Sequence, residues 1–92
     1  MDTYQVSGGI VTSTGKIIAL LKERPPTVAG LSKAYGMVIG MGLRSKDLQL
    51  ALEHARGGDM DLAIKYLYGP TPFDNGEGAI KYFEDIKKAS KR

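Results

Sequence analysis

Hydrophobic residues recur at helical spacing along most of this chain, and the pattern predicts a mainly α fold. The clearest stripe occupies positions i, i+3, i+4 and i+7 and consists of Leu48, Ala51, Leu52 and Ala55. Ser45 precedes this stripe as a good N-cap, Asp47 suits the positive end of the helix dipole, and Gly57 begins a glycine pair that ends the helix. We expect one small domain, residues 1–92, built as a bundle of four to five short helices.

Two further helices have recognisable signals at their ends. One is expected over residues 15–23, because Pro25 follows and the residue before a proline avoids helical backbone angles. Thr27 can cap the helix that leads into residues 34–43, and Asp59 can start another short helix. Side-chain oxygens at such positions accept hydrogen bonds from the free N–H groups of the first turn.

The loop of residues 70–75 precedes the last helix. Asp74 and Glu77 are three residues apart and resemble a capping box that opens this helix. Phe73 lies in the same loop, and we expect it to cover an edge of the core, with a contact to a partner as the alternative. The last helix carries its apolar residues on one face and ends in a basic tail, residues 87–92.

Residues 34–43 (AYGMVIGMGL) contain no charge, and we expect them to form a buried central helix around which the others pack. The stretch is too short to cross a bilayer, which needs about 20 apolar residues, so no membrane partner is expected. Gly36 and Gly40 share one helical face and would let another backbone approach closely. The alternative is a break at one of these glycines; otherwise Gly42 is the expected stop.

The N-terminal segment, residues 1–13, contains several residues that favour strands. A Ser-Gly-Gly turn signal at residues 7–9 separates Tyr4 and Val6 from Ile10 and Val11. This pattern predicts either a short β-hairpin packed on the helices or an irregular arm, and the sequence leaves both open.

The net charge of +3 is unevenly distributed along the chain. Lys87, Lys88, Lys91 and Arg92 lie within the last six residues, and the remaining residues hold 9 bases and 10 acids. A domain that binds duplex nucleic acid usually has a basic face instead. The tail is therefore a candidate contact for an acidic partner or, weakly and in a salt-dependent way, for nucleic acid.

Cysteine is absent, which excludes a disulfide framework, a thiolate nucleophile and a zinc ribbon. The first residues have neither a basic region nor an apolar region typical of a signal peptide. We therefore expect the cytoplasm or another reducing intracellular compartment.

Three patterns resemble functional motifs but lack a required part. Residues 9–16 approach a phosphate-binding P-loop, but five residues separate the glycines and Ile17 occupies the position of the magnesium-ligating hydroxyl. His54 is the only histidine, whereas a metal site needs several ligands. A helix-turn-helix over residues 28–45 would place apolar residues where base-reading groups belong. We accordingly expect no enzyme activity, no cofactor and no metal site.

The sequence therefore favours a protein–protein interaction module of adaptor type that docks a partner through a surface between short helices. Tyrosine and methionine are favoured at such contacts, and basic residues can steer an acidic partner. The candidate partner-binding residues are Arg44, Lys46, Lys65, Tyr66, Tyr68 and Phe73. The alternative is a non-specific nucleic-acid-binding protein assisted by the tail.

The segment GLRSKDL, residues 42–48, resembles the basic helix start in the nucleocapsid-binding C-terminal domains of rhabdovirus phosphoproteins. The resemblance implies a small helical domain with an N-terminal strand pair that grips a protein–RNA template without reading its sequence. The glycine-rich residues 36–42 and the long chain after Leu48 depart from that family's pattern.

Overall fold

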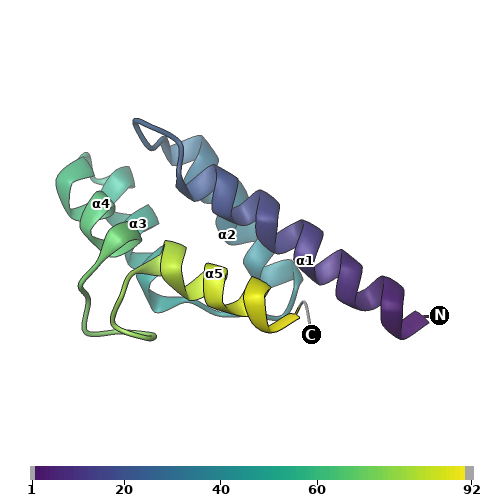
Figure 1. Ribbon diagram of the computed structural model, residues 1–92. Helices are drawn as coiled ribbons and strands as arrows, with labels where there is room; N and C mark the ends of the chain where they lie inside the picture. The colour runs from purple at the N-terminus through teal and green to yellow at the C-terminus, as the bar shows by residue number, and fades with distance from the viewer. Residues whose placement is uncertain (1, 91–92) are drawn as a thin grey trace.

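The computed structural model describes the backbone of residues 2–90 and the side chains of residues 11–90. The described residues form five helices and no strand, with bounds α1 Asp2–Leu21, α2 Val28–Gly40, α3 Lys46–Arg56, α4 Met60–Tyr68 and α5 Ala79–Ser90 (Figure 1). The predicted mainly α fold is confirmed. The tail residues Lys91 and Arg92 lie outside the described residues.

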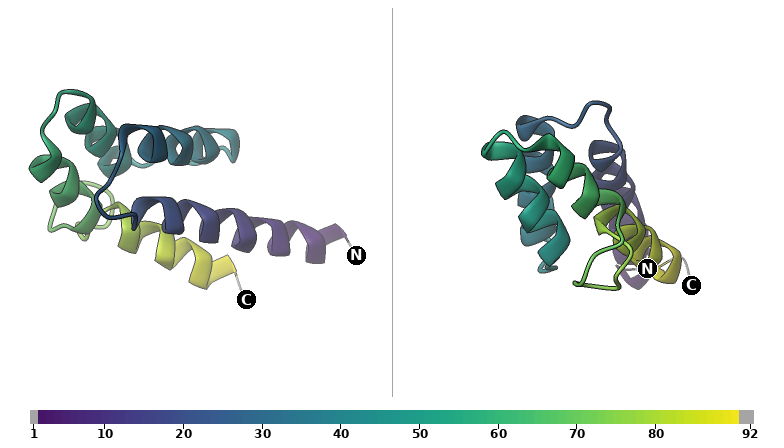
Figure 2. Two further views of the ribbon diagram at one scale, coloured as in Figure 1. Left: turned by 90° about the horizontal axis from the view of Figure 1, so that it is seen from above. Right: turned by 90° about the vertical axis from the view of Figure 1, so that its left-hand side faces the viewer.

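Helix α1 lies between α2 and α5, and the shorter pair α3 and α4 packs at one end of this layer (Figure 2). All five helices contribute to one hydrophobic core, in which Phe83 is the largest fully buried side chain. The buried apolar residues are Ile17, Ile18, Leu21, Leu31, Ala34, Val38, Leu48, Ala51, Leu52, Ala55, Ala63, Leu67, Ala79, Ile80 and Phe83.

The expected N-terminal hairpin or arm is wrong, because α1 begins at Asp2 and includes residues 2–13. The helical period explains this result. Thr14 is fully buried one turn before Ile17, and Val11 is half-buried one turn earlier. The buried face that ends at Leu21 therefore continues towards the N-terminus with helical spacing, and this periodicity outweighs the strand propensity of the individual residues.

The expected burial of residues 34–43 as a central helix is also wrong, because α1, and not α2, lies in the middle of the helical layer. Helix α2 buries only the face that carries Leu31, Ala34 and Val38, and the Ile39 side chain is 50% exposed. Gly36 and Gly40 are exposed, and a Cβ built at either would meet no atom within 4 Å. The close backbone approach predicted for these two glycines is therefore absent from the described residues.

Three predicted N-caps are confirmed. A first-turn N–H group donates to the cap side chain in each case: Gly30 N to Thr27 Oγ1 at 2.9 Å, Leu48 N to Ser45 Oγ at 3.1 Å and Leu62 N to Asp59 Oδ1 at 3.1 Å. Gly42 is the predicted stop of α2 and has a φ of +76°. The Leu43 N–H there donates back to the carbonyl of Val38, as in a Schellman motif.

The chain crosses itself where α4 ends and α5 begins. Gly69 and Gly78 have φ values of +74° and +93°, a region that favours glycine. A Cβ on Gly78 would lie 2.6 Å from both the Gly69 nitrogen and the Leu67 carbonyl oxygen. Both atoms belong to the backbone and have no rotamer by which to move away.

Gly78→Ala should therefore lower the free energy of unfolding by more than about 2 kcal/mol, through left-handed strain and backbone collision together. Gly36→Ala is the matched control, because the same added methyl enters open space on a regular helix. It should raise the free energy of unfolding by roughly 0.5–1 kcal/mol. Urea denaturation of both variants measures these changes, and equal effects at the two sites would contradict the assigned crossing.

Candidate functional site

The first turn of α3 is held by a carboxylate from a distant loop. Asp74 accepts hydrogen bonds from Ser45 Oγ at 2.8 Å and from the backbone N–H groups of Lys46 and Asp47 at 3.2 Å each. The predicted capping box of Asp74 and Glu77 is therefore wrong: α5 begins at Ala79, and Asp74 caps α3 instead. Asp74 has a φ of 51°, a value that is uncommon for residues other than glycine.

Asp47 fastens the same loop from the helix side. Its side chain is fully buried, and Oδ2 accepts a hydrogen bond from Thr71 Oγ1 at 2.9 Å. Oδ1 is buried and accepts no hydrogen bond from any described residue. Burial raises the pKa of the Asp47 carboxyl, the hydrogen bond from Thr71 opposes this, and the charge of Asp74 raises the pKa further.

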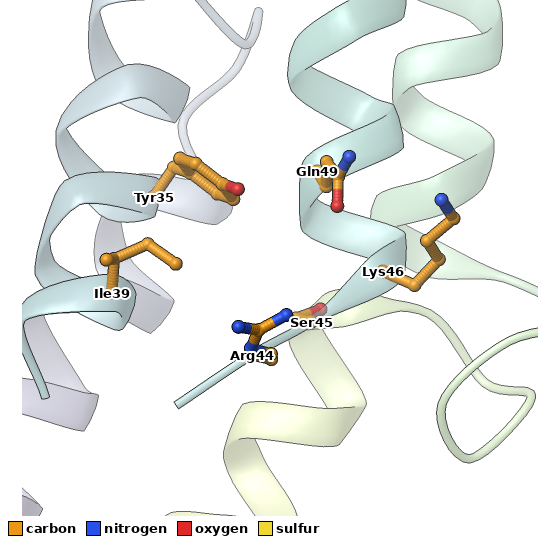
Figure 3. Close-up of a pocket in the computed structure, with 6 residues that line it drawn as sticks. All are labelled: Tyr35, Ile39, Arg44, Ser45, Lys46 and Gln49. Atoms are coloured by element: carbon orange, nitrogen blue, oxygen red, sulfur yellow. The ribbon is translucent and has the colours of Figure 1, made fainter. Parts of the chain in front are cut away.

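A cleft opens between α2 and the start of α3 (Figure 3). Its volume is about 410 Å³, and it is lined by Tyr35, Ile39, Arg44, Ser45, Lys46 and Gln49. Tyr35 and Ile39 project from α2 towards α3, and the Arg44 guanidinium lies between the two helices (Figure 3). The cleft therefore combines an aromatic ring and an exposed aliphatic chain with two cations.

The two cations of the cleft have no acidic partner among the described residues. Arg44 and Lys46 are both exposed, and neither lies within ion-pair distance of a described carboxylate. Gln49 is different, because its amide donates to Glu53 at 3.1 Å. The two positive charges that line the cleft are therefore unpaired within the described residues.

A row of stacked rings continues the surface beyond Lys46. The Lys46 ammonium lies 5.9 Å from the centroid of the Phe73 ring. Phe73 stacks on Tyr66 at 6.4 Å, and Tyr66 stacks on His54 at 5.4 Å with only 9° between the ring planes. We call Phe73, Tyr66 and His54 the aromatic row; all three are half-buried and connect the loop with α4 and α3.

The structure brings together four of the six partner-binding residues expected from the sequence. Arg44 and Lys46 line the cleft, and Tyr66 and Phe73 belong to the aromatic row. Lys65 is exposed on α4 and lines neither feature.

Tyr68 is separate from this surface. Its hydroxyl accepts a hydrogen bond from Arg24 Nε at 3.0 Å, and the Arg24 guanidinium carbon lies 4.6 Å from its ring centroid. This pair joins the connection between α1 and α2 to the end of α4. Tyr68 is therefore engaged within the chain.

The described part of the basic tail is continuous with α5. The Lys87 ammonium lies 3.6 Å from where a Cβ on Gly15 would be, so this side chain folds against α1. Lys88 is exposed. The described tail residues thus differ, since Lys87 is half-buried and only Lys88 points fully to solvent.

Sequence reasoning did not assign Tyr35, Ile39 or His54 to the site. Tyr35 and Ile39 lie in the stretch that was expected to be buried, whereas Tyr35 is only half-buried and Ile39 is exposed. His54 was expected to have only a structural role. Its place three residues before Gly57 gave no sign of a stacking contact with α4.

The chain matches no protein-family model, no curated protein and no solved structure. The strand pair implied by the rhabdovirus resemblance is absent from residues 2–90, where α1 occupies that part of the chain. Within the described residues, no helix has the length and apolar character needed to cross a membrane. The same residues contain no cluster of three or more His, Cys, Asp or Glu side chains suited to a metal ion.

Asp74→Ala should lower the free energy of unfolding by about 2–3 kcal/mol, because it removes three hydrogen bonds to one charged acceptor. Asp85→Ala is the control. Its carboxylate is exposed and contacts only Lys81 and Asn75, so its loss should have a much smaller effect. Urea denaturation at pH 7 measures both. Similar losses for the two variants would contradict the role assigned to Asp74.

Asp47→Asn should gain stability relative to the wild type as the pH rises from about 4 to 7. The raised pKa of Asp47 means that the folded chain keeps a proton that the unfolded chain has released. This contribution is complete below the unfolded pKa and is lost as the pH rises through the folded pKa. Asparagine does not titrate, so the difference between the two unfolding free energies isolates Asp47. A difference that stays constant across this range would refute the assignment.

Proposed function

We propose that this protein is a non-enzymatic interaction module that captures an acidic segment of a partner protein. The segment lies in the cleft between α2 and α3 and continues along the aromatic row. One observation carries the proposal: Arg44 and Lys46 line a cleft together with Tyr35 and Ile39, and neither cation forms an ion pair with a described carboxylate.

The chemistry of this surface favours a partner with both acidic and apolar side chains. Arg44 and Lys46 offer charge-assisted hydrogen bonds to carboxylates. Ile39 and the ring of Tyr35 offer apolar area in the same cleft, and aromatic residues such as those of the row are enriched at protein contacts. Positive charge around the cleft would also speed encounter with an acidic partner at low salt.

Nucleic acid fits the same surface less well. A single strand needs open ring faces on which bases stack, whereas His54 and Tyr66 stack on each other. The half-exposed Ile39 side chain in the cleft has no favourable contact to offer a phosphate. These features favour a protein segment as the ligand. Binding of nucleic acid is the alternative result that the test below can reveal.

The proposal is tested with a phage-displayed library of alanine-based helical peptides, 20 residues long by design, with one face randomised. We expect selection on the wild-type protein to enrich peptides that combine Glu or Asp with Leu, Ile or Phe. Arg44→Ala/Lys46→Ala should weaken the recovered peptides about tenfold, or 1.4 kcal/mol, by fluorescence anisotropy. Lys65→Ala/Lys88→Ala changes the net charge equally outside the cleft and should leave the affinity within about twofold.

Two outcomes would overturn the proposal. One is recovery of no acidic peptide, and the other is equal weakening by the two double variants, which would indicate a response to net charge alone. Tighter binding of a mixed-sequence single-stranded oligonucleotide than of any peptide at about 150 mM salt would favour the nucleic-acid alternative.

A further inference from the structure

The outer face of α2 carries small residues at three positions, with Lys33 as the one long side chain between them. Ala29, Gly36 and Gly40 recur at helical spacing on the side opposite the buried face, and all three are exposed. We call these three residues the α2 ridge. No atom lies within 4 Å of a Cβ built on Gly36 or Gly40, so nothing in the described chain covers this part of the ridge.

A second cleft borders the ridge on its other side. It lies between α1 and α2, has a volume of about 270 Å³, and is lined by Lys16, Ala19, Leu20, Glu23, Lys33 and Met37. Residues 35 and 39 face the first cleft and residues 33 and 37 face the second, so the ridge separates the two. Gly36 and Gly40 carry no side chain and Lys33 lines the second cleft, so both clefts are accessible to one ligand that crosses α2 at these two glycines.

We propose that the α2 ridge seats an acidic α-helix of a partner protein, which crosses α2 and contacts both clefts. The inference rests on the proposed function and adds the shape of the ligand and a second set of cations. Carboxylates on one flank of the partner helix reach Lys16 and Lys33. Those on its other flank reach Arg44 and Lys46.

The ridge explains why the ligand is a helix. Small residues on one face allow a second helix to pack with its backbone unusually close, nearer than the 8–10 Å common between helix axes. Met37 and Ile39 lie on either side of the ridge and offer apolar contact to the residues that flank the crossing point. An extended strand would gain little here, because a helix face presents no unpaired backbone edge.

The charges around the ridge explain why the helix is acidic. Lys16, Lys33, Arg44 and Lys46 are exposed, and none forms an ion pair within the described residues. Glu23 is the one acid that lines either cleft. Its Oε1 lies 2.6 Å from where a Cβ on Gly30 would be, over the first turn of α2, where the positive helix end offsets part of its charge.

A second copy of this chain is a poorer ligand for the ridge. A two-fold axis through the ridge would place α2 of one copy against α2 of the other. Helix α2 contains Lys33 and no acid, and Arg44 follows its C-terminus. Such a pairing would therefore gather like charges on both sides of the contact.

The test uses Gly36→Leu/Gly40→Leu, which fills the ridge without changing the charge. Peptides recovered from the helical library should bind this variant at least tenfold more weakly than the wild type, by fluorescence anisotropy. Ala89→Leu adds a comparable side chain at an exposed position of α5 and should leave the affinity within twofold. Circular dichroism should show that the variants keep the wild-type helix content. Lys33→Ala should also weaken the peptides, although Lys33 does not line the first cleft.

The outcomes separate this inference from the proposed function. If Arg44→Ala/Lys46→Ala weakens the peptides and Gly36→Leu/Gly40→Leu does not, the ridge is not the seat of the helix and only the proposed function survives. If no acidic peptide is recovered, both are overturned. A dimer of the wild-type chain that Gly36→Leu/Gly40→Leu abolishes, seen by sedimentation velocity, would assign the ridge to self-association instead.

Discussion

The carboxylate of Asp74 holds the cleft and the aromatic row in place relative to each other. Its three hydrogen bonds join the loop between α4 and α5 to the first turn of α3. Lys46 begins that turn and Phe73 precedes Asp74 in the loop, so one contact sets the position of the cleft relative to the aromatic row. The crossing of Gly69 and Gly78 makes the loop return possible, because no side chain separates the two backbones.

Local chemistry accounts for the parts of the structure that the sequence predicts well. Thr27, Ser45 and Asp59 cap helices with hydrogen bonds that span three residues, and Gly42 ends α2 through its own backbone angles. Asp74 shows the limit of this reasoning. It has a suitable local partner in Glu77, yet it binds residues 27–29 positions away, and only the folded chain brings those N–H groups within reach.

Helices α1 and α2 show a second limit, which concerns burial. Residues 3–14 contain strand-favouring side chains, but the periodicity read backwards from Leu21 is helical, and that signal prevails. Residues 34–43 are apolar enough to be core, but only one face of α2 is buried. An apolar pattern indicates which residues prefer burial; it does not indicate whether the chain has enough other surface to cover them. Tyr35 and Ile39 of the cleft were therefore missed, because the sequence did not reveal that one face of α2 is left uncovered.

The glycines of α2 raise an energetic question that the chain itself does not answer. Glycine within a helix costs about 1 kcal/mol relative to alanine, and a small domain is stable by only about 5–15 kcal/mol. Gly69 and Gly78 have internal reasons to be glycine, since both have positive φ and touch the opposing backbone. Gly36 and Gly40 have neither, because they are helical and open to solvent. They form a low surface between two clefts whose cations make no ion pair within the described residues, and the proposed helical ligand would give that shape a use.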